Sequence, residues 1–211
     1  MKEYKLPIGC DVPETIILAD GDFPSHPLAL EWLRQCPYVV CCDGAANTYI
    51  RSGRMPEAIV GDGDSLLPDI KERYASLIHS EAEQETNDLS KAFRFCLSQE
   101  RKRITIMGAT GKREDHTIGN VSLLADYMEQ AEVSMMTDYG IFVPIREDSM
   151  FESYIGQQIS VFNMNSTALS AEGLAYPLSV LTNWWQGTLN EALARHFIIR
   201  TEGKVLVFRV F

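Results

Sequence analysis

Cysteines are few in this sequence and carry no recognisable pairing. The chain has five in 211 residues, an odd count with no Cys-x-x-Cys pair, which argues against a disulfide scaffold or a zinc ribbon. Two of them are neighbours in an expected strand, where successive side chains point to opposite faces. We therefore expect reduced, mostly buried cysteines in a cytoplasmic protein. The five are Cys10, Cys36, Cys41, Cys42 and Cys96.

Long apolar runs and an excess of positive charge are also missing. No run approaches the roughly 18 residues needed to span a bilayer, and the first residues show no apolar core of a secretory signal. The 19 Lys and Arg residues are outnumbered by 29 Asp and Glu residues, for a net charge of −10. This balance argues against nucleic acid or an anionic membrane as a partner. An anionic substrate would need a metal ion or a few local cations.

Short apolar runs alternate with amphipathic segments between residues 15 and 137. Such runs are typical of buried parallel strands, and the segments between them are typical of helices. Thr86 and Asn87 are both candidate N-caps of the fourth helix. The pattern predicts an N-terminal, doubly wound, mostly parallel α/β domain, residues 1–138. The expected strands are 15–20, 38–43, 57–62, 103–108 and 132–137, and the expected helices are 26–36, 44–53, 67–77, 87–99 and 116–130.

The pattern changes beyond residue 139. Closely spaced strand candidates follow one another there, separated by Gly, Asn and Ser, and no long helical pattern intervenes. This predicts a small antiparallel all-β sandwich domain, residues 139–211. The expected strands are 140–145, 149–155, 157–164, 195–201 and 204–211.

Three of the α/β strands end in Asp or Gly. Asp43 follows the second strand, Asp62 and Asp64 follow the third, and a glycine-rich loop follows the fourth. The carboxyl ends of parallel strands share one edge of a sheet, so we expect these acids to converge. Converging carboxylates repel one another unless a cation lies among them, and Mg²⁺ with oxygen ligands is the ordinary case. The alternative for Asp62 and Asp64 is a turn in which they bond only local backbone.

The stretch 108–120 joins a strand to a helix. Its glycines allow close backbone approach to a phosphate, the helix N-terminus favours an anion, and Lys112 and Arg113 add positive charge. It lacks the spacing of a P-loop, so a tight turn with a solvated basic tip remains an alternative. Asp88 and Lys91 lie one turn apart on a helix and could serve the site or form a surface ion pair. His116 taken alone is more often a structural hydrogen-bonding residue than a base.

Together these stretches resemble the thiamine pyrophosphokinase family. The matching elements occur in the family's order, and the last is the most specific because Arg113, Asp115, His116, Asn120, Leu123 and Leu124 all match. They are Asp43-Gly44-Ala45-Ala46-Asn47, Gly61-Asp62-Gly63-Asp64-Ser65, residues 85–92 and residues 108–124. Residues 172–192 in the second domain resemble the family's thiamine-side segment.

Two positions depart from the family pattern. Lys112 stands where a second glycine is usual, which could alter the backbone approach to the phosphates or add a cation to them. Leu189 stands where a serine is usual before Asn190, which removes a possible hydrogen bond to the substrate. Trp184 and Trp185 could stack on a ligand, but we expect them in the β-domain core or in a dimer contact.

The resemblance implies a Mg²⁺-dependent enzyme that transfers the diphosphate of ATP to the hydroxyl of thiamine, giving thiamine diphosphate and AMP. It also implies a homodimer with a shared active site. We assign Asp43, Asp62, Asp64 and Asp88 to catalysis, the last three of them to Mg²⁺. The expected ATP-binding residues are Lys91, Gly111, Lys112, Arg113, Asp115, His116 and Asn120, and the expected thiamine-binding residues are Tyr176 and Asn190.

Two other functions compete with this one. A nucleotide- or thiamine-binding module without turnover would keep the pocket, and the Leu189 departure is its support. A Mg²⁺-dependent phosphohydrolase would use the same carboxylates with water as the nucleophile, and would release phosphate or diphosphate without thiamine.

Overall fold

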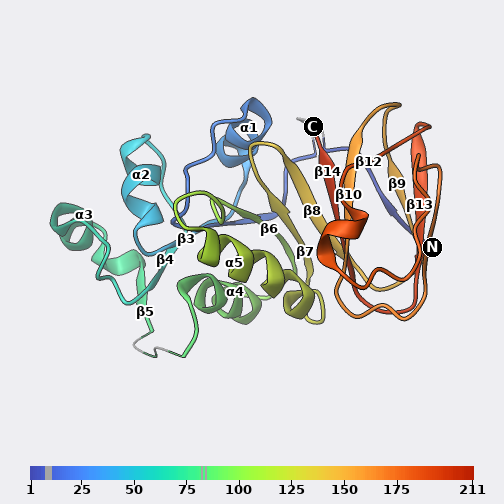
Figure 1. The fold of residues 1–211 in the computed structure, drawn as a ribbon. Helices are drawn as coiled ribbons and strands as arrows, with labels where there is room; N and C mark the ends of the chain where they lie inside the picture. Colours follow the sequence, from blue (N-terminus) through green and yellow to red (C-terminus); the bar gives the residue numbers. More distant parts are fainter. Residues whose placement is uncertain (8–10, 82, 84) are drawn as a thin grey trace. The chain divides into compact units, whose positions relative to one another are not determined.

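The structure is a computed structural model that describes residues 1–7, 11–81, 83 and 85–211 (Figure 1). The chain divides into two compact units. The α/β unit comprises Gly9–Asp138, and the β unit comprises Met1–Ile8 together with Tyr139–Phe211. Each unit has its own secondary structure and is described separately below.

The α/β unit is built on a parallel sheet. Its strands lie in the order β7-β6-β2-β3-β4-β5, and every neighbouring pair in this order is parallel. Because β3 to β5 extend the sheet on one side of β2 and β6 and β7 on the other, the winding direction reverses between β2 and β6. The strands are β2 (Thr15–Leu18), β3 (Val39–Cys42), β4 (Ala58–Gly61), β5 (Ile78–Ser80), β6 (Arg103–Met107) and β7 (Glu132–Met136).

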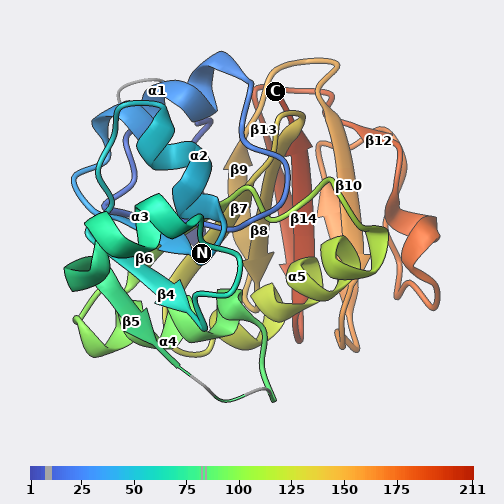
Figure 2. The ribbon, with the colours of Figure 1, turned by 90° about the vertical axis from the view of Figure 1, so that its left-hand side faces the viewer.

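Helices cover both faces of this sheet. In Figures 1 and 2, α1 and α2 lie on one face and α4 and α5 on the other. The N-cap of α4 is Asn87, whose side chain accepts a hydrogen bond from Ser90 N, so it is Asn87 and not Thr86 that begins this helix. The helices are α1 (Pro27–Gln35), α2 (Ala45–Arg51), α3 (Pro68–Arg73), α4 (Asp88–Ser98) and α5 (Glu114–Tyr127), with a 3-10 turn η1 (Ala75–Leu77) after α3.

The central strands are buried along their whole length. All four residues of each of β2, β3 and β4 are inaccessible to solvent, which explains their continuous apolar sequences. The prediction of a doubly wound α/β fold is confirmed. The sequence pattern missed β5, because "IHS" is short, polar and half exposed at the edge of the sheet.

The β unit is a sandwich of two layers, each of four strands among the described residues. In one layer the strands have the order β12-β10-β14-β8 and in the other β1-β9-β13-β11. Both contribute side chains to one core, in which Phe151 and Phe197 stack at 5.1 Å. The strands are β1 (Lys2–Tyr4), β8 (Gly140–Ile145), β9 (Ser149–Glu152), β10 (Gln158–Asn163), β11 (Leu169–Glu172), β12 (Asn190–Glu191), β13 (His196–Thr201) and β14 (Val205–Val210), with a 3-10 turn η2 (Trp184–Gly187).

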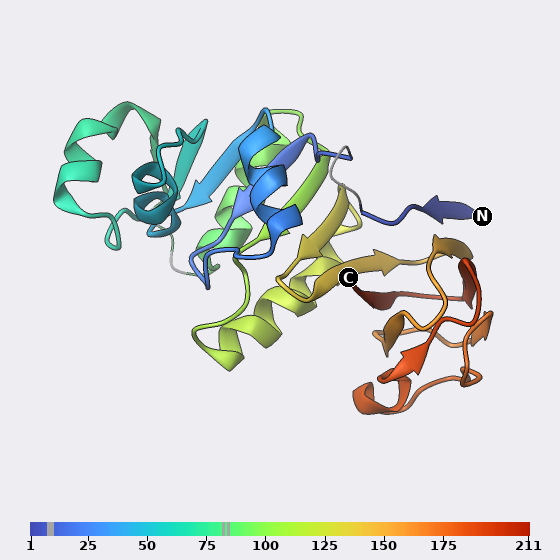
Figure 3. The same ribbon diagram turned by 90° about the horizontal axis from the view of Figure 1, so that it is seen from above.

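The first residues of the chain belong to the β unit, which corrects the expectation that residues 1–138 form one domain. Strand β1 pairs in parallel with β9, and Figure 3 shows the N-terminal strand beside the other strands of the β unit. The Tyr4 ring stacks on Phe151 at 4.8 Å, and Arg209 donates hydrogen bonds to Lys5 O and Glu152 O. A three-residue strand whose partner lies far along the chain has no local sequence signal.

The described cysteines are free thiols, and three of them, Cys41, Cys42 and Cys96, are buried. Cys36 is half-buried, and Cys10 lies outside the described residues. Burial raises the pKa of the Cys96 thiol to about 12, which makes it a poor nucleophile at neutral pH. Within the described parts of the chain, no helix has both the length and the apolar character that a membrane span requires.

Removing the Tyr4 ring should destabilise the β unit. We expect Tyr4→Ala to lower the free energy of unfolding by about 1–2 kcal/mol, because it removes a stacked aromatic pair and partly buried apolar surface. Denaturant unfolding of the full chain measures this. Glu3→Ala is the matched control, since Glu3 is exposed on the opposite side of the same strand. Equal stabilities of the two variants would contradict the assignment of β1 to the β unit.

Candidate functional site

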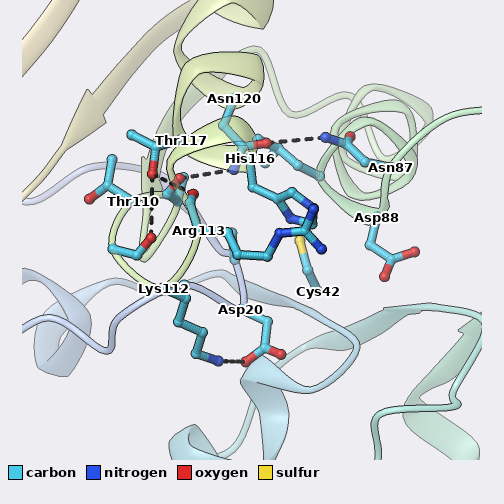
Figure 4. Close-up of a pocket in the computed structure, with 15 residues that line it drawn as sticks. Asp20, Cys42, Asn87, Asp88, Thr110, Lys112, Arg113, His116, Thr117 and Asn120 are labelled. Atoms are coloured by element: carbon cyan, nitrogen blue, oxygen red, sulfur yellow. Dashed lines mark hydrogen bonds and ion pairs between the residues drawn. The ribbon is translucent and has the colours of Figure 1, made fainter.

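A cavity of about 370 Å³ lies at the carboxyl end of the parallel sheet (Figure 4). The loops after β2 and β6 form much of its wall, so it occupies the point where the winding of the sheet reverses. This is where open α/β sheets bind ligands, and the volume suits a small molecule. The lining comprises Ala19–Gly21 after β2, Cys42 in β3, Asn87–Leu89 at the start of α4, Ala109–Arg113 after β6, and His116, Thr117 and Asn120 of α5.

One wall of the cavity carries basic side chains. Lys112, Arg113 and His116 line it together at the beginning of α5, and the backbone of Arg113 is the N-cap of that helix. The unpaired N–H groups of a helix N-terminus and the nearby cations both favour an anion. Arg113 forms two hydrogen bonds to Asp115, of 3.1 and 2.6 Å. Asp115 does not line the cavity, so its contact with Arg113 places it in a supporting position.

Asn120 connects the walls of the cavity. Its amide donates to Ala109 O at 2.9 Å, and its carbonyl oxygen accepts from Asn87 Nδ2 at 3.1 Å. These bonds tie α5 to the loop after β6 and to the start of α4. Asn120, predicted to contact the nucleotide, therefore also fixes the relative positions of three lining segments.

Carboxylates gather beside the cavity at the ends of β3 and β4. Asp43 is 3% exposed and adopts a left-handed conformation with φ 31°, which Asp tolerates better than most residues. A Cβ atom on Gly61 would lie 2.8 Å from Asp43 Cβ and 3.4 Å from Asp88 Cγ, so a glycine is required between them. Asp88 also lines the cavity and thus connects this acidic group with the basic wall.

The chemical environment of Asp43 opposes its negative charge. Burial raises the pKa of the Asp43 carboxyl, the hydrogen bond from Ser65 N lowers it, and the nearby charges of Asp88 and Asp62 raise it further, with a net increase. Asp43 Oδ1 is buried and has no hydrogen-bond partner among the described residues. A buried carboxylate oxygen in this state is suited to a cation.

The remaining predicted acids and Lys91 lie around this centre. Asp62 accepts a hydrogen bond from Asp64 N at 3.0 Å, as the turn alternative predicted, while Asp64 is itself exposed. Lys91 is buried, does not line the cavity, and donates to Asp88 Oδ1 at 3.1 Å. Burial alone would lower the pKa of the Lys91 ammonium, but Asp88 outweighs this effect and the pKa is raised.

The acidic group fits a magnesium ion that completes its coordination with other ligands. Among the described residues, no three His, Cys, Asp or Glu side chains converge closely enough to hold a metal by themselves. Mg²⁺ commonly takes one or two protein carboxylates and fills its other positions with water and phosphate oxygens. Asp43 and Asp88, which flank Gly61, meet that requirement, and Asp43 supplies the unpartnered oxygen.

In the β unit the two predicted thiamine-side residues have different surroundings. The Tyr176 ring is exposed, whereas Asn190 is 2% exposed and makes only internal bonds. Asn190 Oδ1 accepts from Tyr176 N, and Asn190 Nδ2 donates to Tyr176 O at 2.8 Å. The side chain of Asn190 therefore positions the backbone of Tyr176.

The tryptophans and Leu189 lie on the surface of the β unit. Trp184 touches Phe162 edge-on and Trp185 is 72% exposed, so neither lies in the buried core, and the dimer contact stays the predicted alternative. Leu189 is exposed and has φ 60°, a left-handed conformation that is unusual for a bulky residue.

Asp20 is a lining residue that the sequence analysis did not select. Asp20 comes two residues after the last residue of β2, Leu18, and belongs to no recognised motif. It nevertheless obeys the rule that identified Asp43 and Asp62, which is that acids at strand ends converge. Applied to β2, that rule would have found it. Asn87 and Thr117 also line the cavity; they fall within the matching elements 85–92 and 108–124, but the sequence analysis assigned neither of them a role at the site.

Comparisons with known proteins identify both units. The family model of the thiamin pyrophosphokinase catalytic domain matches residues 29–136, and that of the thiamin pyrophosphokinase substrate-binding domain matches residues 140–208. A curated relative, thiamine pyrophosphokinase 1 of Oryza sativa subsp. japonica, is 30% identical over an alignment of 129 residues, and the match covers 49% of each chain. Thiamine pyrophosphokinase of Bacillus subtilis is 34% identical over 86 residues, 39% of this chain and 40% of its own. The chain thus spans about half or less of the length of these relatives.

Solved structures share the fold. Thiamin pyrophosphokinase from Candida albicans has a TM-score of 0.79 at 17% identity, over 100% of this chain and 93% of its own. Thiamine pyrophosphokinase from Bacillus subtilis has a TM-score of 0.78 at 21% identity, over 93% and 98%. At such identities the likeness establishes the arrangement of strands and helices.

Neutralising Asp43 should stabilise the protein at neutral pH. In Asp43→Asn the amide can still accept from Ser65 N, while burial of charge and repulsion from Asp62 and Asp88 disappear. Because the pKa of Asp43 is raised in the folded state, its charge destabilises the folded wild type above that pKa. Below the unfolded-state pKa of 3.8 the carboxyl is protonated in both states, and the destabilisation is absent. The gain of the variant should therefore be full at pH 7 and vanish as the pH falls below about 4. Urea unfolding across this range measures it, and a gain that does not depend on pH would contradict the assignment.

Removing the Asn190 side chain should destabilise the β unit through Tyr176. We expect Asn190→Ala to cost about 1–2 kcal/mol, because it removes two part-buried hydrogen bonds to the backbone of Tyr176. Thermal or urea unfolding measures the loss. The control Tyr176→Ala keeps the backbone bonds and should cost less than half as much. A larger loss in the control would show that the ring, and not Asn190, holds this segment.

Proposed function

Because the chain belongs to the thiamin pyrophosphokinase family, we propose that it transfers the diphosphate of ATP to the hydroxyl of thiamine. The products would be thiamine diphosphate and AMP, and the reaction would depend on Mg²⁺. The single observation that best supports this is the cavity at the winding reversal, which has basic side chains on one wall and Asp88 on another. A polyphosphate chain needs both cations and a metal site, and few other ligands need both.

The acidic group would hold the metal. Asp88 and Asp43, which flank Gly61, would hold Mg²⁺ together with water and phosphate oxygens, and the other two predicted acids, Asp62 and Asp64, would join them when the ion is bound. When bound, the ion would neutralise phosphate charge and polarise a phosphoryl oxygen. Lys91 fixes the Asp88 carboxylate from its buried side, and the Ser65 amide fixes Asp43. A carboxylate of this group would also accept the proton that leaves the thiamine hydroxyl.

The basic wall would hold the phosphate chain. Lys112, Arg113 and His116, with Gly111 and the first N–H groups of α5, would bind its oxygens, and Asn120 would keep their loop in place. The hydroxyl attacks the β-phosphorus and AMP leaves, so the residues act by in-line positioning and charge neutralisation. Asp115 would hold Arg113 in a fixed orientation through its two hydrogen bonds.

The β unit would bind thiamine. The exposed Tyr176 ring could stack on the cationic or pyrimidine ring of the substrate. Asn190 would hold the backbone of Tyr176 in position through its hydrogen bonds. We also propose a cytoplasmic homodimer with a shared active site. The exposed aromatic residues of the β unit, Tyr176, Trp184 and Trp185, support an interface there.

The test is ³¹P NMR of purified protein with ATP, Mg²⁺ and thiamine, with a thiamine-free sample beside it. We expect thiamine-dependent formation of AMP and thiamine diphosphate. Asp64→Asn should reduce the rate at least about 100-fold, because metal-assisted charge neutralisation supplies several kcal/mol. Asp69→Asn, an exposed acid in the first turn of α3, is the charge-matched control and should keep the wild-type rate.

Other product patterns would overturn the proposal in recognisable ways. ADP with thiamine monophosphate would mean that the wrong phosphorus is attacked. ATP breakdown without thiamine would indicate the phosphohydrolase. Thiamine binding without turnover would indicate the binding module.

A further inference from the structure

An ion pair closes one side of the cavity. Lys112 Nζ lies 3.0 Å from Asp20 Oδ1, and both residues line the cavity, as the dashed line in Figure 4 shows. Asp20 follows β2 and Lys112 follows β6, so the pair spans the point where the winding of the sheet reverses. The match to the catalytic-domain family model begins at residue 29 of this chain and does not cover Asp20.

The carboxylate of Asp20 is held on both sides. While Oδ1 faces Lys112, Oδ2 packs against the turn after β3, where a Cβ atom on Gly44 would lie 2.6 Å from it. The acid thus stands between the basic wall and the turn that carries Asp43. Its position is fixed by backbone packing as well as by the lysine.

The ion pair is not needed to hold the two loops together. Gly21 N donates to Gly108 O at 2.6 Å, and Asp22 N donates to Thr110 O at 2.8 Å, so backbone bonds already join them. The side chains of Lys112 and Asp20 are 56% and 46% exposed, and ion pairs so exposed add little stability. The pair therefore needs an explanation other than folding.

The backbone of Lys112 adopts a strained conformation that places its side chain at the cavity. Lys112 has φ 32°, in the left-handed region that glycine adopts more readily. Strained residues of this kind concentrate at ligand-binding sites, where the surrounding structure holds them. A lysine kept here at a conformational cost places an ammonium group at the cavity, where Asp20 then partly neutralises it.

Two of the basic side chains of the wall, Lys112 and Arg113, differ in how firmly they are paired. Arg113 has two hydrogen bonds to Asp115, whereas the structure gives Lys112 a single contact to Asp20. A phosphate chain carries more charge than one carboxylate and could replace a single exposed contact. Asp20, by contrast, would repel the same chain from across the cavity.

We propose that Lys112 binds the polyphosphate chain and that Asp20 competes with the chain for the Lys112 ammonium group. Asp20 is thus a specificity-determining residue, which weakens polyphosphate binding until the chain displaces its carboxylate from Lys112. The inference rests on the proposed function, because it assumes that the cavity receives a phosphate chain. Asp20 would thereby keep the affinity of the site moderate and allow the phosphate-bearing product to leave.

A double-mutant cycle tests the competition. Isothermal titration calorimetry with sodium triphosphate and no thiamine would compare the full-length wild type, Asp20→Asn, Lys112→Met and the double variant. Glu31→Gln is the matched control, since it neutralises an exposed acid of the same unit that is paired with Arg34 and does not line the cavity. Far-UV circular dichroism and thermal melting would verify that every variant is folded, and Lys112→Gln would replace Lys112→Met if the latter is not.

We expect Asp20→Asn to tighten triphosphate binding about three- to tenfold at low salt. The gain should shrink at 0.3 M salt, and at least half of it should be lost when Lys112 is already replaced. Glu31→Gln should change the affinity less than twofold. Lys112→Met alone should weaken binding.

Three results would overturn the inference. Weaker binding by Asp20→Asn would mean that Asp20 orients Lys112 for the ligand. An unchanged affinity would mean that the pair does not compete with it. A full gain in the Lys112→Met background would mean that Asp20 acts by general repulsion.

Thiamine diphosphate formation is measured separately from triphosphate binding. A failed mutant cycle with normal turnover therefore refutes this inference alone, and a successful cycle without turnover refutes the proposed function alone.

Discussion

The pairing of β2 with β3 on one side and β6 on the other is the constraint on which the candidate site depends. Ile16 lies opposite both Val39 and Thr105, so the three strands end almost level with one another. Their following loops must then meet at one edge of the sheet. A shift of β6 against β2 would separate Lys112 from Asp20, and a shift of β3 against β2 would move Asp43 away from Asp20.

The convergence of carboxylates at this edge serves ligand binding but destabilises the folded protein. Asp43, Asp62 and Asp88 repel one another, and burial adds to the cost of the Asp43 charge. The chain offsets this locally, with the Ser65 amide on Asp43 and the Lys91 ammonium on Asp88. Asp43 Oδ1 is left without a partner in the described structure, which suits a site that is completed by its ligands. Natural proteins commonly retain such destabilised groups where activity requires them.

Much of the fold could be predicted from the sequence because its signals are local. Neighbouring residues alone specify the buried runs of β2, β3 and β4 and the Asn87 cap. Once these strands are recognised as parallel, the rule that acids at strand ends converge follows from the sequence as well. What could not be predicted depends on distant partners. Strand β1 forms only by pairing with β9, and Asn190 is held by hydrogen bonds to the backbone of Tyr176, 14 residues earlier in the chain. The two tryptophans show the same limit, since apolar character alone does not say which face of a small domain is covered.

The pairing of β1 with β9 also affects how the protein is made. Ser149, the partner of Lys2, is synthesised on the order of ten seconds after it. In that interval the whole α/β unit is completed, and it can fold as one contiguous stretch. The β unit, by contrast, joins β1 to strands as late as β14, which ends at Val210. Its sandwich can close only after β14 has been synthesised, so β1 must stay unpaired and free of wrong partners until then.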